Sequence, residues 1–189
     1  LAIVNRAFEP HLESELLAVV LPEAAQQIAR LVTWCQRHQV PYLARGTGTG
    51  ISGAAIPTHG GLVIEMARMN RVLEIDLENG VAVVEPGVIN QDLKQLLLEH
   101  GYTYTYVPDP GSQVVSTIGG NVSTNAGGMH CLKYGMTTNH ILALEVLLAD
   151  GSLVAAAWPE PDPEIVAAAW PDPEREAQVI GAERESLVD

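Results

Sequence analysis

The stretch RGTGTGISGA, Arg45–Ala54, contains four glycines in ten residues and directly follows the short apolar segment VPYLA at 40–44. Glycine loses more conformational freedom on folding than any other residue, so a cluster of glycines indicates that something approaches the backbone closely. Backbone N–H groups in glycine turns form concave anion sites, and Thr and Ser hydroxyls add donors. Arg45 adds a positive charge beside them. The stretch therefore predicts a site for a phosphate-bearing ligand.

A second glycine-rich segment, GSQVVSTIGGNVSTNAGGMHCLKYGMT, occupies residues 111–137. Few of its side chains are candidates for a core. These are Val114, Val115, Ile118 and Val122. A loop of this length without structure of its own is uncommon and is usually functional. Two such segments in one domain favour a phosphate-bearing ligand over two ordinary flexible loops.

The elements around these segments predict an α+β domain. Apolar runs predict strands at 17–20, 40–44, 62–65, 72–76, 81–85, 102–106 and 141–148, the strand at 102–106 being exposed. Helices are expected from Pro22 onward, with Pro in the first turn, and over 91–100, with Asn90 as its cap and Gly101 as its stop. Asn79-Gly80 predicts a hairpin between 72–76 and 81–85. In a Rossmann unit the glycine loop follows the first strand and opens a helix, whereas here it follows the second strand and leads to another strand.

Composition excludes some classes of function. The net charge is −13, and nine of the 23 acidic residues lie within 151–189, so the basic surface that nucleic-acid binding requires is scarce. Neither an apolar run of membrane-spanning length nor a signal peptide stands out, which predicts a cytoplasmic protein. Cys35 and Cys131 are far apart without metal-ligand spacing, and we expect two reduced thiols.

The two ends of the chain differ from the middle. Because the first residue is Leu, residues 1–16 are interpreted as an N-terminal remnant. Residues 154–165 and 166–177 form a near-repeat, VAAAWPEPDPEI and VAAAWPDPEREA. Its prolines and acids predict an extended or disordered tail over 154–189. Trp158 and Trp170 could anchor a partner, but an unselected repeat is the favoured interpretation.

Taken together, six motifs resemble one family. They are PYLARGTGTGISGAAIP (41–57), GLVIEMARMNRVLEID (61–76), AVVEPGV (82–88), PDPGS (108–112), TIGGNVSTNAGG (117–128) and CLKYGMTTNHILALEVLLADG (131–151). Their order and spacing over residues 17–153 resemble the FAD-binding domain of vanillyl-alcohol-oxidase-type flavoproteins. The likeness is greatest to the FAD subunit of glycolate oxidase and to FAD-linked D-lactate and D-2-hydroxyacid dehydrogenases.

The resemblance implies a two-subdomain FAD-binding fold that lacks the cap (substrate) domain, with FAD between the subdomains. It implies that the first loop wraps the pyrophosphate and that the later motifs line the flavin and the rest of the dinucleotide. The implied cofactor-binding residues are Arg45, Gly46, Thr47, Gly48, Thr49, Gly50, Ser52, Gly53, Pro108, Asp109, Gly111, Ser112, Thr117, Gly119, Gly120, Asn121, Thr124, Asn125, Gly127, Gly128, Tyr134, Gly135 and Thr137.

The implied chemistry is hydride transfer from a 2-hydroxy acid such as glycolate or D-lactate to FAD, with no metal. Some relatives bind flavin covalently through a His in the first loop. No His lies between Arg45 and Pro57, so noncovalent FAD is expected, and His130 is interpreted as a half-exposed loop residue. The base and the carboxylate clamp of relatives come largely from the cap domain, so no catalytic residue is assigned. The resemblance also implies an iron–sulfur partner subunit that could associate the chain with a membrane.

Two alternatives stay open. The chain could be a non-catalytic FAD-binding fragment or accessory subunit, which the missing cap favours. It could also resemble the enolpyruvyl-sugar reductases of peptidoglycan synthesis, although the motifs at 108–112 and 139–151 fit that group less well.

Overall fold

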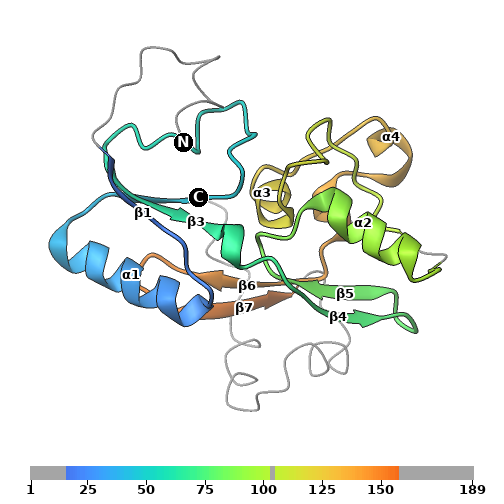
Figure 1. The fold of residues 1–189 in the computed structure, drawn as a ribbon, viewed down its shortest axis with the longest axis horizontal. Helices are drawn as coiled ribbons and strands as arrows, with labels where there is room; N and C mark the ends of the chain where they lie inside the picture. Colours follow the sequence, from blue (N-terminus) through green and yellow to red (C-terminus); the bar gives the residue numbers. More distant parts are fainter. Residues whose placement is uncertain (1–15, 103–104, 158–189) are drawn as a thin grey trace, which may run out of the picture.

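The computed structural model describes residues 16–102 and 105–157 (Figure 1). The strands are β1 (Leu16–Val20), β2 (Tyr42–Arg45), β3 (Gly61–Glu65), β4 (Val72–Asp76), β5 (Val81–Val84), β6 (Ala143–Leu147) and β7 (Leu153–Ala157). The helices are α1 (Ala25–His38), α2 (Asn90–Glu99), α3 (Ile118–Ser123) and α4 (Cys131–Tyr134), with 3-10 turns η1 (Met66–Arg68) and η2 (Thr137–His140).

One half of the molecule is a parallel sheet with α1. The strand order is β1-β3-β2, and the apolar run of β3 is buried in the middle of this sheet. Helix α1 buries Val32 and Cys35 and contacts β6. The helix begins at Ala25, so the predicted first turn containing Pro22 is not helical. The Glu23 amide, just before the helix, donates to Gln27 Oε1 (2.8 Å). The predicted strands and helix are otherwise confirmed within a few residues.

The other half packs α2 and α3 against the hairpin β4–β5 (Figure 1). The hairpin pairs antiparallel from Val72↔Val84 to Asp76↔Val81, as Asn79-Gly80 predicted. The buried residues of this core are Val88, Leu93, Leu97 and Ile118, with partly buried apolar side chains around them. An amphipathic helix therefore covers one face of a two-stranded sheet, which could not be stable alone.

The predicted cap of α2 is wrong. Asn90 is the first helical residue, is fully buried, and donates through Nδ2 to the Pro108 carbonyl (3.1 Å), while Ile89 occupies the N-cap position without a side-chain cap. Asn90 therefore joins α2 to the second glycine-rich segment. The predicted stop is confirmed, because Gly101 (φ +72°) follows the helix and its amide donates to the Leu98 carbonyl.

The segment 111–137 was expected to lack structure, and this prediction is wrong. It contains α3, α4 and the start of η2. The Thr117 side chain caps α3 by accepting from the Gly120 amide (3.1 Å). Glycine and β-branched residues disfavour helix, so this short helix depends on its cap and on tertiary contacts.

The predicted exposed strand at 102–106 is also not observed in the described residues. Tyr102, Thr105 and Tyr106 are not in a strand, and residues 103 and 104 lie outside the described part of the chain. Tyr102 and Tyr106 instead pack against the apolar core beside α2.

The described chain ends in the antiparallel hairpin β6–β7, paired from Ala143↔Ala157 to Leu147↔Leu153. Strand β7 thus includes the first residues of the predicted tail, and 158–189, with both tryptophans of the repeat, lie outside the described residues. Cys35 is buried and Cys131 is exposed, both as free thiols. Among the described helices, none is long and apolar enough to cross a membrane.

Candidate functional site

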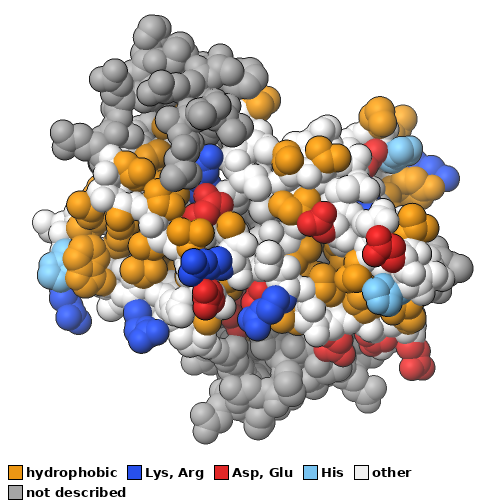
Figure 2. All heavy atoms as spheres, in the orientation of Figure 1, with side chains coloured by type: hydrophobic (Ala, Val, Ile, Leu, Met, Phe, Trp, Pro, Cys, Tyr) orange, Lys and Arg blue, Asp and Glu red, His pale blue; other side chains and the backbone are white. Residues whose placement is uncertain are grey.

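A cleft of about 1560 Å³ runs between the two halves. Both glycine-rich segments line it, together with residues of β4, β5 and the hairpin β6–β7. In Figure 2, white backbone and uncharged polar atoms, with a few charged side chains among them, lie between two regions that carry many apolar side chains. Ligand pockets commonly measure about 300–1,000 Å³, so this cleft is large enough for an extended ligand such as a dinucleotide.

The structure brings many of the predicted site residues together on the cleft wall. Those that line it are Arg45, Gly46, Thr47, Gly48, Thr49, Gly50, Ser52, Ser112, Thr117, Gly119, Gly120, Asn121, Thr124 and Gly127. The others do not line it: Gly53, Pro108, Asp109, Gly111, Asn125, Gly128, Tyr134, Gly135 and Thr137.

The two glycine-rich segments touch one another across the cleft floor. Thr47 Oγ1 donates to the Val115 carbonyl (2.7 Å), joining residues 68 positions apart in the sequence. A Cβ at Gly46 would overlap the side chain of Thr117, the cap of α3. The first loop and α3 therefore form one surface, and a side chain at position 46 would push them apart.

The first loop offers free backbone donors. Within the described part of the chain, the amides of residues 47–52 donate no backbone hydrogen bond. Residues 47–49 are buried or partly buried and residues 50–52 are exposed, so these amides are available to a ligand or to water. This arrangement fits an anion such as a pyrophosphate.

The glycines of the second segment serve a different purpose. The amides of Ile118 and Gly119 donate to the carbonyls of Val88 and Pro86, so the start of α3 has few free donors. A Cβ at Gly119 would lie 2.7 Å from Pro86 Cβ. Gly119 thus allows close packing of α3 on the backbone at Pro86. The sequence had predicted instead that this segment lines the flavin and the rest of the dinucleotide.

The basic side chains of the cleft are already paired. Among the described lining residues, Arg45 and Arg71 are the only Lys or Arg. Arg45 Nε lies 3.4 Å from Glu65 Oε2 but makes no hydrogen bond within the described residues, whereas Arg71 Nη2 lies 2.6 Å from Glu85 Oε1 and donates to it. The hydrogen bond from Arg71 lowers the pKa of the buried Glu85 carboxyl, although its burial opposes this. Because each of these cations already has a carboxylate beside it, we expect backbone amides to supply most of the donors for an anion.

A buried side chain on the wall also has an unused donor. Asn121 is 2% exposed, and its Nδ2 has no hydrogen-bond partner in the described residues. An unpaired buried amide group is costly, about 1–3 kcal/mol, unless a ligand or water satisfies it. Together with the free amides of 47–52, this donor shows that the residues present fit FAD.

We predict that Asn121→Leu reduces FAD affinity about 5- to 15-fold, the equivalent of one lost hydrogen bond. The free energy of unfolding should change little, because an unsatisfied polar group is replaced by an apolar one of similar volume. Asn90→Leu should do the opposite, since it removes the hydrogen bond to Pro108 and does not contact the cleft. Flavin titration and thermal unfolding of both variants test this, and equal affinity losses would contradict it.

Asp109 was predicted to line the flavin; it is absent from the cleft lining and its carboxylate contacts His130. Asp109 Oδ2 lies 2.5 Å from His130 Nδ1, and the His130 amide donates to Oδ1 (3.3 Å). Asp109 is buried, whereas the His130 side chain is 61% exposed. The hydrogen bond from His130 lowers the pKa of the Asp109 carboxyl, and the charge of Lys94 adds to this. The pair ties the turn at 108–112 to the start of α4.

Acid should therefore release this pair. A carboxyl with a lowered pKa in the folded state stabilises the fold above its unfolded pKa of about 3.9, and that stability is lost as the pH falls through the lower folded value. We predict that the thermal midpoint of Asp109→Asn falls less steeply below about pH 4 than that of the unmodified chain. Melting curves between about pH 6 and pH 2.5 test this, and parallel curves would contradict it.

Sequence reasoning missed the acidic partners of the cleft arginines. Glu65 is paired with Arg45 in the register of the parallel strands β2 and β3. Glu85 meets Arg71 because the two residues flank the open end of the hairpin β4–β5. The hairpin signal at Asn79-Gly80 could have placed 71 near 85, but no local pattern relates residue 45 to residue 65.

Comparison with known proteins gives close relatives by sequence. The glycolate oxidase subunit GlcD of Bacillus subtilis (strain 168) is 44% identical over 145 residues, which cover 77% of this chain and 30% of that protein. The D-lactate dehydrogenase of Archaeoglobus fulgidus is 37% identical over 141 residues, covering 75% and 31%. The chain thus spans less than a third of the length of these relatives.

Solved structures share the fold. Berberine bridge enzyme superposes with a TM-score of 0.70 at 22% identity, covering 81% of this chain and 30% of that one. An alkyldihydroxyacetonephosphate synthase gives a TM-score of 0.64 at 25% identity, covering 78% and 26%. The expected vanillyl-alcohol-oxidase-type fold is confirmed. The family described as FAD binding domain matches residues 16–157, and the chain therefore belongs to this family, with FAD as its cofactor.

Proposed function

We propose that the chain is the FAD-binding portion of a flavin-dependent oxidoreductase that oxidises a small 2-hydroxy acid such as glycolate or D-lactate. The observation that carries this is the cleft, whose first loop offers free amides where a diphosphate is expected. The substrate class is supported by the relatives, which are named glycolate oxidase subunit and D-lactate dehydrogenase.

The residues of the chain would have distinct tasks. The amides of 47–52 bind the diphosphate, and Asn121 donates from the adjoining helix α3. Apolar side chains of β5 and β6, such as Val83 and Val146, exclude water from the rest of the cleft. The bound flavin supplies the acceptor for the hydride of the substrate. The first loop contains no His, which supports noncovalent binding.

Catalytic groups for the substrate are not proposed within this chain. A base and a carboxylate clamp are required for hydride removal from a 2-hydroxy acid, and they are expected outside the portion that this chain shares with its relatives. Because that portion is 30% of the B. subtilis protein, cofactor binding without turnover is the second candidate. That relative is a subunit of glycolate oxidase, which supports a partner chain for this protein as well. We propose that the partner is an iron–sulfur protein that accepts electrons and brings the chain to a membrane.

The test begins with a titration of the purified chain with FAD, followed by absorption and fluorescence. Saturable binding with a shifted flavin spectrum is the expected result. Anaerobic addition of D-lactate or glycolate then separates the candidates: bleaching of the flavin supports the full activity, and no bleaching supports binding alone. Oxidation of NADPH with an enolpyruvyl sugar nucleotide would instead indicate the reductase alternative. Absence of FAD binding in a chain that circular dichroism shows to be folded would overturn the proposal.

A further inference from the structure

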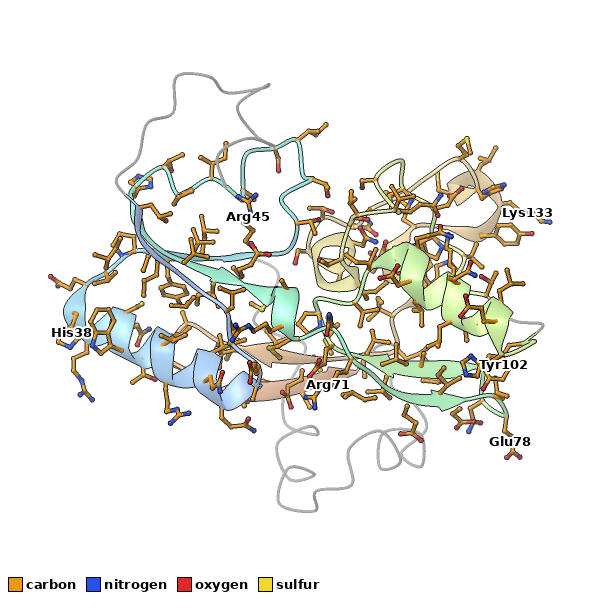
Figure 3. All side chains as sticks on the ribbon, viewed as in Figure 1. His38, Arg45, Arg71, Glu78, Tyr102 and Lys133 are labelled. Atoms are coloured by element: carbon orange, nitrogen blue, oxygen red, sulfur yellow. The ribbon has the colours of Figure 1, made fainter. Side chains whose placement is uncertain are left out.

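The side chain of Arg45 lies at the cleft wall and contacts the first loop at two places. It leaves the end of β2 at the point where the loop begins (Figure 3). Only 10% of the side chain is exposed, and Nη1 donates to the Ala55 carbonyl at 3.4 Å. Arg45 therefore contacts the far end of the loop that starts immediately after it.

The loop closes tightly over this guanidinium. Gly48 is buried with φ +74°, and a Cβ there would lie 2.5 Å from Arg45 Nη2. A side chain at position 48 would thus be strained by the backbone and blocked by the arginine. The backbone of the loop therefore bends around the Arg45 side chain, which contacts it at Gly48 and Ala55.

The charge of Arg45 is balanced from the neighbouring strand. Glu65 pairs with Arg45 in the register of β2 and β3, and its side chain is 14% exposed. Burial raises the pKa of the Glu65 carboxyl, and the charge of Arg45 opposes part of that rise. Removing one partner of a largely buried ion pair leaves the other charge without compensation, so Glu65 and Arg45 depend on each other although Arg45 Nε makes no hydrogen bond within the described residues.

We propose that Arg45 is a positioning residue, held by Glu65, that shapes the loop 46–55 so that its amides converge on the diphosphate. This inference rests on the proposed binding of FAD in the cleft. It differs from the role expected from sequence, in which Arg45 supplies a charge directly to the phosphate. In the positioning role, Glu65 is as necessary for cofactor binding as Arg45.

A double-mutant cycle distinguishes the two roles. Arg45→Met and Glu65→Gln should each reduce FAD affinity about 10- to 100-fold. The double variant should bind FAD no more weakly than the single variant with the lower affinity, because both changes release the same loop. Arg45→Lys should behave like Arg45→Met, since an ammonium keeps the charge but cannot span Glu65 and Ala55 together. If Glu65→Gln binds FAD normally or more tightly while Arg45→Met loses affinity, the positioning role is excluded.

A matched control lies in the same half of the molecule. Arg68 and Glu23 form an ion pair of 3.1 Å whose side chains are 59% and 63% exposed, and neither lines the cleft. Arg68→Met and Glu23→Gln should leave FAD affinity within about twofold, because exposed pairs contribute little. A loss similar to that of the Arg45 variants would mean that the effect is a general one of charge removal.

A readout without cofactor separates this inference from the proposed function. Backbone ¹⁵N relaxation of the free protein should show lower order parameters for residues 46–55 in Glu65→Gln and in Arg45→Met than in the unmodified chain, below about 0.6. Unchanged order parameters would overturn the positioning role even if FAD binds. If the order parameters of residues 46–55 fall in both variants but the unmodified chain does not bind FAD, the positioning role is supported and only the proposed function is overturned.

Discussion

Gly50→Val should weaken FAD binding about 10- to 100-fold while leaving the fold intact. Gly50 lines the cleft within the run of free amides, and a Cβ there meets no atom of the described residues within 4 Å. Its φ is not in the positive range, so a β-branched residue is tolerated by the backbone. Any loss of affinity must therefore come from a ligand that approaches the backbone at this position.

Gly111→Val is the control for this experiment. A Cβ at Gly111 also meets nothing within 4 Å, but Gly111 does not line the cleft. We expect Gly111→Val to bind FAD as the unmodified chain does, and both variants to melt within about 2 °C of it. Equal FAD affinity in the two variants would contradict the placement of the diphosphate on the first loop.

Gly61→Ala should be the most destabilising of the glycine substitutions considered, by about 3 kcal/mol or more. Gly61 has φ +89°, and a Cβ there would overlap the Pro41 carbonyl oxygen, which accepts the Leu62 amide where β3 begins beside β2. Strain and overlap therefore act together at the start of the central strand. The thermal midpoint should fall by about 6–12 °C, measured by circular dichroism.

Gly80→Ala separates these two causes. Gly80 has φ +65° in the turn of the hairpin β4–β5, and a Cβ there meets nothing within 4 Å. Only the backbone strain remains, so the loss should be about 1 kcal/mol, or about 2–4 °C. If both variants lose the same stability, the close approach of Pro41 to Gly61 is not what selects glycine.

Many elements of the fold followed from local patterns. The apolar run of β3, the amphipathic face of α1 and the Asn79-Gly80 turn each lie within a short window of sequence, and each was predicted within a few residues. The first glycine loop belongs to the same class, because its composition and its place after a strand indicated a ligand contact. The motifs also carried the resemblance to FAD-binding domains, which the family match confirms.

The failures share a different feature. Asn90 has the side chain of a helix cap, yet the Pro108 carbonyl takes its amide. The segment around α3 has the composition of a loop, yet Thr117 and the contact with Pro86 hold it as a helix. The contacts with Pro108 and Pro86 join residues far apart in the chain and override a local preference of only about 1 kcal/mol per residue, whereas the Thr117 cap is a local feature.

The sequence by itself thus determined the family, the cofactor and the loop that is proposed to receive the diphosphate. Only the tertiary structure decided which groups remain available to a ligand, because availability depends on the partners that each group has already found. Arg45 carries a charge in any conformation, but only the register of β2 and β3 places Glu65 beside it, and only the fold shows that the amides of 47–52 donate no backbone hydrogen bond within the described residues. Residue type is a local property, whereas the pairing of a charge or a donor arises from contacts between segments far apart in the chain.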